Sequence, residues 1–436
     1  MSEQYTVHPS YKISGTINVQ GDKSISHRSL ILLSISEGTA KITGLLESED
    51  CLATLKIFRM LGVKIEKNSN NSYTVHGKGK YGLKGTNGNL DCGNSGTTMR
   101  LLAGLMSAQK FPSSLVGDSS LSKRPMERIS KPLTMMGANI SLSENKTAPI
   151  KINSIDKVKS IEYKMPIDSA QIKSSIILAS LYADKKTKIT ENISTRDHTE
   201  NMINFLNGNV TTLDNEIIID PMSKLISRDI DIPGDISSAM FIIVACLISK
   251  KSEILIENVG LNDLRTGSIE ILKLMGAKIT VLNIKKYGPE NVGDIRVKSS
   301  NLKGIEIPKK YVANAIDEFP IIFIAAANAS GKTLLKNAEE LRYKESDRLD
   351  AMSKGLTSCK INNNLFNDGI EIEGGEINGT VVDSFGDHRV AMSFAIAGVS
   401  AKNPITILNT ESISTSFPNF YSLAKLIGIN IIRENI

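Results

Sequence analysis

The sequence predicts an α/β protein of two domains, each built from three copies of one repeat. Its 436 residues suffice for two or three domains at roughly 150 residues per domain. Six segments share a pattern in which a helix ends and a strand begins, and successive copies lie roughly 70 to 80 residues apart. Copies of this length fit a βαβαββ-like unit, and six separate domains of about 70 residues would each have a marginal core.

Glycine marks the end of a helix in each repeat, because it adopts the left-handed backbone that follows the last helical turn. These glycines are Gly62, Gly137, Gly208, Gly276, Gly355 and Gly428. Short strands rich in Thr and Ile are expected at residues 38–42, 188–190, 253–256, 331–335 and 404–407, because β-branched residues favour strands. The turn pair Pro233-Gly234 predicts the boundary between the two domains.

A polar segment precedes the first helix of each repeat. The six segments are residues 21–28, 93–100, 168–173, 233–238, 317–320 and 385–389. Each predicts backbone N–H groups and a positive helix end that bind anions, although any one of them alone is most simply a helix cap. Most carry Lys or Arg in the first turns, and equivalent ends of equivalent repeats lie on one side of a domain. We therefore expect two domains to enclose a cationic cleft for a small phosphate or carboxylate compound.

Two acidic residues complete this prediction. Asp317 precedes a strongly apolar helix, and Glu345 lies where another helix opens, so both could reach the cleft. Cations around an acid lower its pKa, which would leave Asp317 ionised and able to accept a proton at neutral pH. The alternative for both acids is a capping or salt-bridging role.

Composition restricts partners and location. The net charge of +6 is scattered, which does not require a nucleic acid partner. The longest apolar stretches, residues 239–248 and 319–327, are about half the length of a membrane-spanning helix. The N-terminus lacks the features of a signal peptide, so a cytoplasmic protein is expected. The four Cys and five His residues are dispersed, which indicates neither a metal site nor disulfides.

The chain resembles the enolpyruvyltransferase family over essentially its whole length. Six motifs in the same order carry this resemblance: Gly21-Asp-Lys-Ser-Ile-Ser-His-Arg28, Asn94-Ser-Gly-Thr-Thr-Met-Arg100, Lys123-Arg-Pro-Met126, Asp317-Glu-Phe-Pro320, Lys344-Glu-Ser-Asp-Arg348 and Asp387-His-Arg389. The resemblance implies a two-domain inside-out α/β barrel of six βαβαββ repeats. Residues 20–234 would form the domain on the shikimate-phosphate side, and residues 1–19 with 235–436 the second domain.

The resemblance also implies a reaction. The enolpyruvyl (1-carboxyvinyl) group of phosphoenolpyruvate would pass to the 5-hydroxyl of shikimate 3-phosphate, on the route to chorismate and the aromatic amino acids. No cofactor or metal is implied, the partners are the two small substrates, and the family is usually monomeric.

Site residues are carried over by position. The shikimate phosphate side would be formed by Lys23, Ser24, Arg28, Ser169, Gln171 and Arg196, the last matching only part of the family. Phosphoenolpyruvate would contact Lys23, Gly96, Arg124, Arg348 and Arg389, and Lys344 would reach the substrates from the second domain. Asp317 would take the hydroxyl proton, and Glu345, helped by Lys23, would deliver and remove the methylene proton. Thr415 stands where many members have a Lys, so one phosphate contact would be missing or supplied elsewhere.

Two other functions fit the sequence less well. The sister enzyme UDP-N-acetylglucosamine 1-carboxyvinyltransferase carries Lys-Asn in its first loop and a reactive Cys shortly before the loop Arg. This chain has Lys23-Ser24 and no cysteine between Cys92 and Cys246. A non-catalytic RNA binder would need clustered aromatic residues and a basic stripe, and the sequence has neither.

Overall fold

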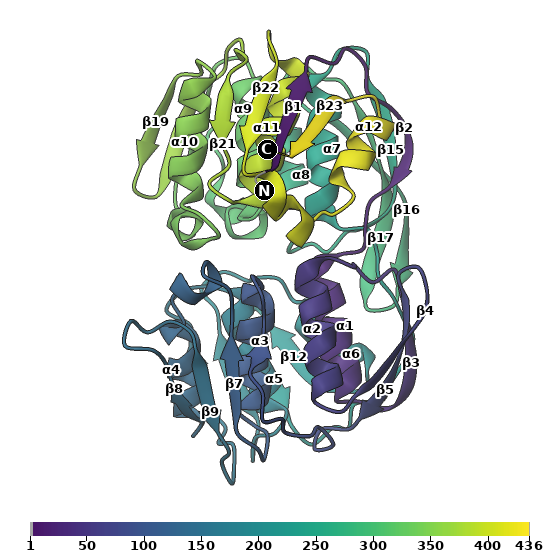
Figure 1. Cartoon of the computed structure of the whole chain (residues 1–436), viewed down its shortest axis with the longest axis vertical. Coiled ribbons are helices and arrows are strands. Elements are labelled where there is room, and N and C mark those ends of the chain that lie inside the picture. The colour runs from purple at the N-terminus through teal and green to yellow at the C-terminus, as the bar shows by residue number, and fades with distance from the viewer. Residues whose placement is uncertain (1–2, 436) are drawn as a thin grey trace. The chain divides into compact units, whose positions relative to one another are not determined.

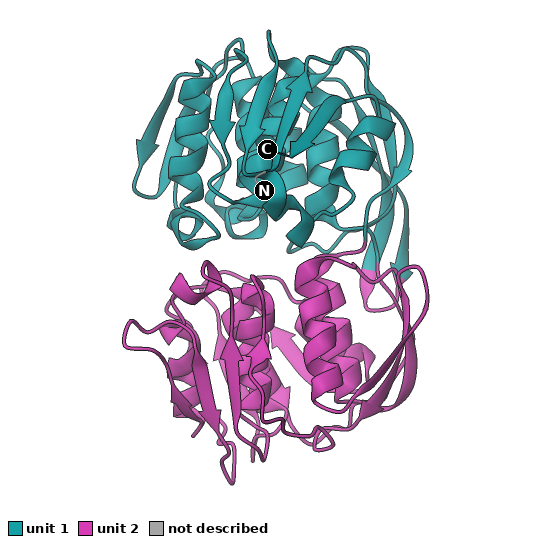
Figure 2. Ribbon diagram, viewed as in Figure 1, with its two compact units in different colours: residues 1–20, 233–286, 291–436 teal, residues 21–232, 287–290 magenta. Residues whose placement is uncertain are grey.

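The computed structural model describes residues 3–435 and divides into two compact units (Figure 2). Unit 1 consists of Met1–Gln20, Pro233–Lys286 and Asn291–Ile436, and unit 2 of Gly21–Ile232 and Tyr287–Glu290. Each unit has its own hydrophobic core. The fold is α/β, as predicted, and the described strands form six separate sheets, three in each unit.

Unit 2 shows the predicted repeat most completely in its second and third copies (Figure 1). The second copy runs β6 (Leu90–Asp91), α3 (Gly96–Met106), β7 (Ser113–Val116), α4 (Glu127–Met135), β8 (Asn139–Ser141) and β9 (Ile150–Asn153). The third runs β10 (Glu162–Lys164), α5 (Ala170–Ser180), β11 (Thr187–Thr190), α6 (His198–Phe205), β12 (Asn209–Leu213) and β13 (Glu216–Asp220). In both sheets the first strand pairs parallel to the second, and the last two strands join antiparallel. Both copies therefore have the βαβαββ order.

The first copy of unit 2 takes its initial strand from a distant segment. It contains α1 (Lys23–Ser34), β3 (Glu37–Thr43), α2 (Glu49–Met60), β4 (Lys64–Ser69) and β5 (Ser72–Lys78). The strand parallel to β3 is β14 (Ile230–Asp231), at the far end of the unit's sequence. The first sheet of unit 2 is thus completed by a strand that follows the third repeat.

Unit 1 is built in the same way from chain segments on both sides of unit 2. Its fourth copy contains β2 (Ser14–Asn18), α7 (Ile236–Ile248), β15 (Glu253–Gly260), α8 (Gly267–Leu274), β16 (Lys278–Tyr287) and β17 (Glu290–Lys298). Its fifth contains α9 (Phe319–Ala327), β18 (Lys332–Leu335), α10 (Arg348–Ser358), β19 (Asn363–Phe366) and β20 (Gly369–Glu373). Its sixth contains β21 (Val381–Asp383), α11 (His388–Ser400), β22 (Ile405–Leu408), α12 (Phe420–Leu426), β23 (Asn430–Asn435) and, from the N-terminal segment, β1 (Glu3–His8).

The first helix of each repeat is buried. All nine residues of α9 are buried, as are nearly all of those in α7 and α11. A helix that is apolar on every side requires cover on every side. In unit 1 these three helices pack against one another, and α3 packs on α5 in unit 2. The N-terminal ends of these helices carry the predicted polar segments. None of the helices within residues 3–435 is both long and apolar enough to cross a membrane.

Four of the six predicted helix-ending glycines have the expected left-handed backbone. They are Gly62, Gly137, Gly276 and Gly428, with φ between +85° and +100°. The other two predictions were wrong in detail. Asn207, with φ +69°, ends the third-copy helix in place of Gly208, and Gly355 lies within α10, whose left-handed residue is Lys360 at φ +64°. Asparagine tolerates this conformation better than most residues.

Candidate active site

Several of the polar segments begin with a side chain that caps its helix. In unit 2, Asp22 accepts a 2.8 Å hydrogen bond from a backbone N–H in the first turn of α1, and Ser95 accepts one of 3.1 Å in α3. In unit 1, Asp235 and Asp387 cap α7 and α11 at 2.8 and 2.9 Å. Helix ends with exposed N–H groups and a positive dipole favour anions nearby.

The first two turns of α1 carry Lys23, Ser24 and Arg28. The buried guanidinium of Arg28 donates to the Ser24 carbonyl at 3.0 Å, to Ser174 Oγ at 2.8 Å and to Thr199 Oγ1 at 2.7 Å. Ser174 lies on α5 and Thr199 on α6. Three helices of unit 2 therefore fix the position of this cation.

Lys23 has a carboxylate partner that the sequence did not predict. Its Nζ lies 2.5 Å from Asp50 Oδ2, on the first turn of α2. Burial, together with the charges of Lys23 and Arg28, holds the pKa of His27 on the same helix well below its usual range. The N-terminal end of α1 thus carries two cations, Lys23 and Arg28, with the carboxylate of Asp50 beside Lys23.

Gly96 and Arg124 lie together. The Arg124 guanidinium donates to Asn94 Oδ1 at 2.9 Å. A Cβ atom added to Gly96 would lie 3.1 Å from Arg124 Nη1 and 3.3 Å from Arg100 Nη1. The absence of a side chain at position 96 leaves room for two arginine head groups at the start of α3.

Gln171 and Ser169 lie at the start of α5. Gln171 accepts a hydrogen bond from Arg100 Nη1 and donates to Thr97 Oγ1 at 3.0 Å, which links α5 to α3. Ser169 is the residue before α5, and its side chain makes no capping bond to the helix. Gln171, Arg100 and Gly96 therefore belong to one connected cluster.

Arg196 lies in a loop that a buried lysine holds in place. Lys173 Nζ contacts Glu191 at 3.0 Å and Glu200 at 2.8 Å, and it donates to the carbonyl of Thr195 at 2.9 Å. Burial alone would lower the pKa of Lys173, but Glu200 and Glu191 outweigh burial and raise it. The residue next to Arg196 is thereby tied to a permanently charged group.

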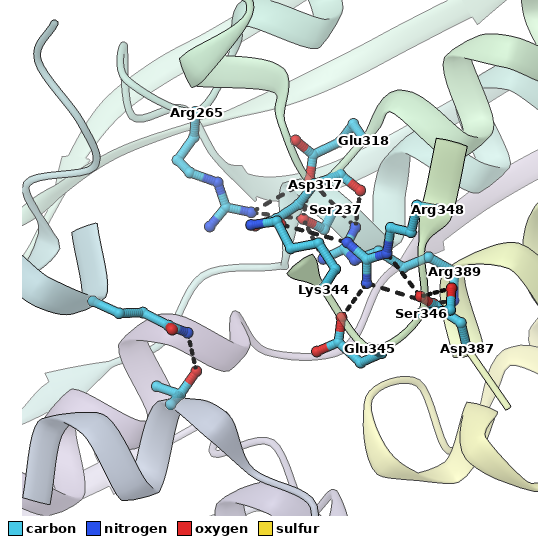
Figure 3. Close-up of polar contacts among 12 residues, drawn as sticks. Ser237, Arg265, Asp317, Glu318, Lys344, Glu345, Ser346, Arg348, Asp387 and Arg389 are labelled. Atoms are coloured by element: carbon cyan, nitrogen blue, oxygen red, sulfur yellow. Dashed lines mark hydrogen bonds and ion pairs between the residues drawn. The ribbon is translucent and has the colours of Figure 1, made fainter. Parts of the chain in front are cut away.

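In unit 1, Asp317 faces two cations (Figure 3). Its Oδ1 lies 3.4 Å from Lys344 Nζ and 3.6 Å from Arg348 Nη1. Arg348 also contacts Glu345 Oε2 at 2.5 Å and Asp387 Oδ2 at 2.8 Å. Asp317, Lys344, Glu345 and Arg348, all predicted from the sequence, are therefore brought together by the start of α10 and the segment before α9.

Arg348 and Asp387 are held in their charged forms. Burial opposes the charge on Arg348, yet Asp387, Glu345 and Asp317 together raise its pKa. Burial would raise the pKa of Asp387, but Arg348 outweighs it, so that this pKa lies below the usual value. The cation is fixed in place and cannot be neutralised near pH 7.

Arg389 extends this cluster to a second arginine. Its Nη1 donates to the Asp317 carbonyl at 2.9 Å and lies 3.5 Å from Glu318 Oε1. Its Nη2 donates to Ser237 Oγ at 3.3 Å, and Arg265 Nη2 donates to the same oxygen at 2.6 Å. Figure 3 shows both guanidinium groups reaching Ser237 from different segments.

Several residues of these clusters were absent from the predicted site, and six of them carry or meet its charged groups: Asp50, Arg100, Ser237, Arg265, Glu318 and Asp387. Four of these six lie inside the predicted polar segments, so the sequence predicted their segments but did not single out these residues. Asp50 and Arg265 lie outside those segments, and only packing brings them close. Thr415, at the position of the missing Lys, donates to the Ser412 carbonyl at 2.7 Å and supplies no positive charge.

Each unit thus presents several cations with acids among them. Such a set binds compounds with several phosphate or carboxylate groups, because arginine binds two oxygens at once. Within residues 3–435, no group of three or more His, Cys, Asp or Glu side chains is placed to hold a metal ion.

Comparison with known proteins identifies one enzyme family by its sequence model, by similar sequences and by solved structures. The family model for EPSP synthase (3-phosphoshikimate 1-carboxyvinyltransferase) matches residues 7–423. The 3-phosphoshikimate 1-carboxyvinyltransferase of Legionella pneumophila strain Philadelphia 1 is 53% identical over 419 residues, 96% of each chain. That of Methylococcus capsulatus is 48% identical over 427 residues, 98% of each chain. The solved EPSP synthase of Acinetobacter baumannii is 48% identical, with a TM-score of 0.89 over 99% of this chain and 100% of that one.

Proposed function

The chain belongs to the EPSP synthase family, and we propose how its own residues carry out the reaction of that family. The reaction is the transfer of the enolpyruvyl group of phosphoenolpyruvate to the 5-hydroxyl of shikimate 3-phosphate. The products are 5-enolpyruvylshikimate 3-phosphate and inorganic phosphate. This step belongs to the shikimate pathway of aromatic amino acid biosynthesis, and the enzyme is a transferase.

The proposed division of labour follows the two units. Lys23, Ser24, Arg28, Ser169, Gln171 and Arg196, all in unit 2, would bind shikimate 3-phosphate. Phosphoenolpyruvate would be bound by Lys23, Gly96, Arg124, Arg348 and Arg389, and Lys344 would contact the substrates. The clusters described above support this division, because each places fixed guanidinium or ammonium groups at the starts of helices. We propose that residues 20–234, and residues 1–19 with 235–436, act as the two domains.

Asp317 is the proposed base. The observation that carries this role is its position between Lys344 and Arg348, at 3.4 and 3.6 Å, because two cations favour the carboxylate that must accept a proton. Its side chain is partly exposed, so an incoming hydroxyl could reach it. The 5-hydroxyl would lose its proton to Asp317 as its oxygen bonds to the central carbon of phosphoenolpyruvate.

Glu345 is the proposed acid and base at the methylene carbon. It would protonate this carbon as the 5-hydroxyl attacks, giving a tetrahedral adduct that still carries phosphate. It would then remove a proton from the same carbon as the C–O bond to phosphate breaks, and the proton held by Asp317 would pass to the departing phosphate. Glu345 contacts Arg348 at 2.5 Å, which favours the carboxylate. An anionic substrate on Arg348 would weaken that pairing and let Glu345 take up a proton, and Lys23 would assist both transfers.

We further propose that the enzyme acts in the cytoplasm as a monomer, needs no cofactor, and has no nucleic acid or membrane partner. Its two substrates are small, highly charged acids that are dissolved in water. Light scattering during size-exclusion chromatography tests the monomer, since a dimer would elute with twice the mass of the chain.

The direct test is a phosphate-release assay with phosphoenolpyruvate and shikimate 3-phosphate. Phosphate should appear only when both substrates are present, and a chelator should leave the rate unchanged. UDP-N-acetylglucosamine in place of shikimate 3-phosphate should give no phosphate. Phosphate release from phosphoenolpyruvate with the aminosugar nucleotide, but not with shikimate 3-phosphate, would favour the sister enzyme.

A further inference from the structure

Two arginines and a glutamate of unit 1 meet at the hydroxyl group of Ser237. Ser237 lies in the first turn of α7 and is 4% exposed. Its Oγ accepts hydrogen bonds from Arg265 Nη2 at 2.6 Å and Arg389 Nη2 at 3.3 Å, and it donates its hydrogen to Glu318 Oε1. A serine hydroxyl has one donor and two acceptor sites. All three are used here.

The hydroxyl separates two like charges. Arg265 and Arg389 both donate to it, and Glu318 Oε1 lies 3.7 Å from Arg265 and 3.5 Å from Arg389. Asp235, at 3.8 Å from Arg265 Nη2, adds a second carboxylate. Arg265 and Glu318 are 3% and 2% exposed, so little solvent screens this group. Its geometry is therefore set by these partners.

One member of the cluster reaches the proposed reaction. Arg389 uses Nη2 on Ser237 and Nη1 on the carbonyl of Asp317. Its guanidinium is thereby held at two points, one on α7 and one on the residue proposed as the base (Figure 3). The hydrogen bonds of Ser237 Oγ go to Arg265, Arg389 and Glu318. Arg389 therefore links Ser237 to Asp317.

We propose that Ser237 is a positioning residue for phosphoenolpyruvate binding, and that it acts by fixing the guanidinium of Arg389 against the charge of Arg265. This inference rests on the proposed function, because it takes Arg389 as a ligand of phosphoenolpyruvate. The role differs from a purely structural one in acting on one substrate and through one arginine.

The test is the Ser237→Ala enzyme in the phosphate-release assay. We expect KM for phosphoenolpyruvate to rise about tenfold, the size expected for losing one hydrogen bond to a charged group. KM for shikimate 3-phosphate should stay within about twofold, and kcat within about threefold. Alanine favours helices, so α7 should still form, and a thermal melt checks this. If the alanine variant does not fold, Ser237→Cys takes its place in the test. The thiol has nearly the shape of the hydroxyl but forms only weak hydrogen bonds, so KM for phosphoenolpyruvate should rise in this variant too.

Ser238→Ala is the matched control. Ser238 is also 4% exposed in the same turn, but its hydroxyl accepts from Gln20 Nε2 at 3.2 Å, outside the arginine cluster. Both KM values should remain within about twofold of the wild type. A rise in KM for phosphoenolpyruvate equal to that of Ser237→Ala would overturn the inference, because any buried hydroxyl of this turn would then serve.

A second cycle tests whether the effect passes through Arg389. In an Arg389→Lys background, Ser237→Ala should change KM for phosphoenolpyruvate less than about twofold, because lysine cannot bridge both partners. The full tenfold change in that background would overturn the inference, as would an unchanged KM in the folded single variant. A wild-type enzyme that releases no phosphate from the two substrates would instead overturn the proposed function and, with it, this inference.

Discussion

At the scale of single residues, Arg348 shows how acidic side chains hold a buried cation in place. Its side chain is 1% exposed, yet Asp317, Glu345 and Asp387 all lie within 3.6 Å of it. Removing one partner of such a group leaves charge without compensation, which typically costs about 3–5 kcal/mol. Asp387 is wholly buried and also caps α11, so it sets the position of Arg348. Asp317 and Glu345 are more exposed than Arg348 and Asp387.

Replacing Asp317 with alanine should separate chemistry from binding. We expect kcat to fall by about 10²- to 10⁴-fold, the usual contribution of a general base. The dissociation constant of shikimate 3-phosphate should change less than about threefold, because its proposed ligands lie in unit 2. The assay and calorimetry measure the two quantities. Asp263→Ala, at an exposed position, is the control, and a kcat within tenfold of the wild type would remove Asp317 from the role of base.

At the scale of an element, α10 shows why a glycine did not end its helix. Gly355 is buried in the helix, and a Cβ atom at this position would lie 2.1 Å from Cζ of Phe394 on α11. The glycine therefore allows an aromatic ring to pack directly on the helix backbone. The sequence pattern predicted a glycine that ends the helix. A glycine that ends a helix and a glycine that gives room for an aromatic ring can stand at nearly the same place in the repeat, so the pattern does not distinguish them.

Gly355→Ala should destabilise the protein although alanine is the better helix former. Helix propensity favours alanine by about 1 kcal/mol, whereas overpacking costs about 1–3 kcal/mol. A contact as short as 2.1 Å places the cost at the upper end, so we expect a net loss of roughly 1–2 kcal/mol. Chemical denaturation measures this loss. Phe394→Leu should recover part of it in the double variant, and Ser358→Ala, exposed on the same helix, should change stability by less than about 0.5 kcal/mol. Equal or greater stability in the single variant would contradict this account.

At the scale of the whole molecule, three strands join sheets formed by distant parts of the chain. β14 pairs with β3, β2 pairs with β15, and β1 lies between β22 and β23. The chain begins in unit 1, builds unit 2 and then returns to complete unit 1. Unit 1 therefore depends on contacts between residues about as far apart in sequence as this chain allows, such as Val7 with Ile405 and Ile431.

A chain that starts after His8 should lose the stability of unit 1. Removal of β1 would leave β22 and β23 without the strand that lies between them. It would also remove the buried side chains of Tyr5 and Val7 and expose the core residues that they cover. Limited proteolysis should cleave rapidly within residues 233–436, while the segment 21–232 resists cleavage. Tyr11→Ala, at a side chain that is 80% exposed, should leave the cleavage pattern unchanged. A truncated enzyme with the wild-type melting temperature would contradict this role for β1.

The sequence by itself determined the repeat, the helices that carry polar starts, and the kinds of residue at the site. These features depend on local chemistry, since glycine, capping residues and apolar periodicity act over a few positions. Asp317 could be proposed in this way, because it precedes an apolar helix, whereas Lys23, Arg28 and Arg348 were assigned to the site by the motifs that resemble the family. The tertiary structure decided which partner each side chain meets. Asp50 beside Lys23, and Arg265 beside Ser237, come from elements whose approach depends on packing between helices, which no local pattern encodes.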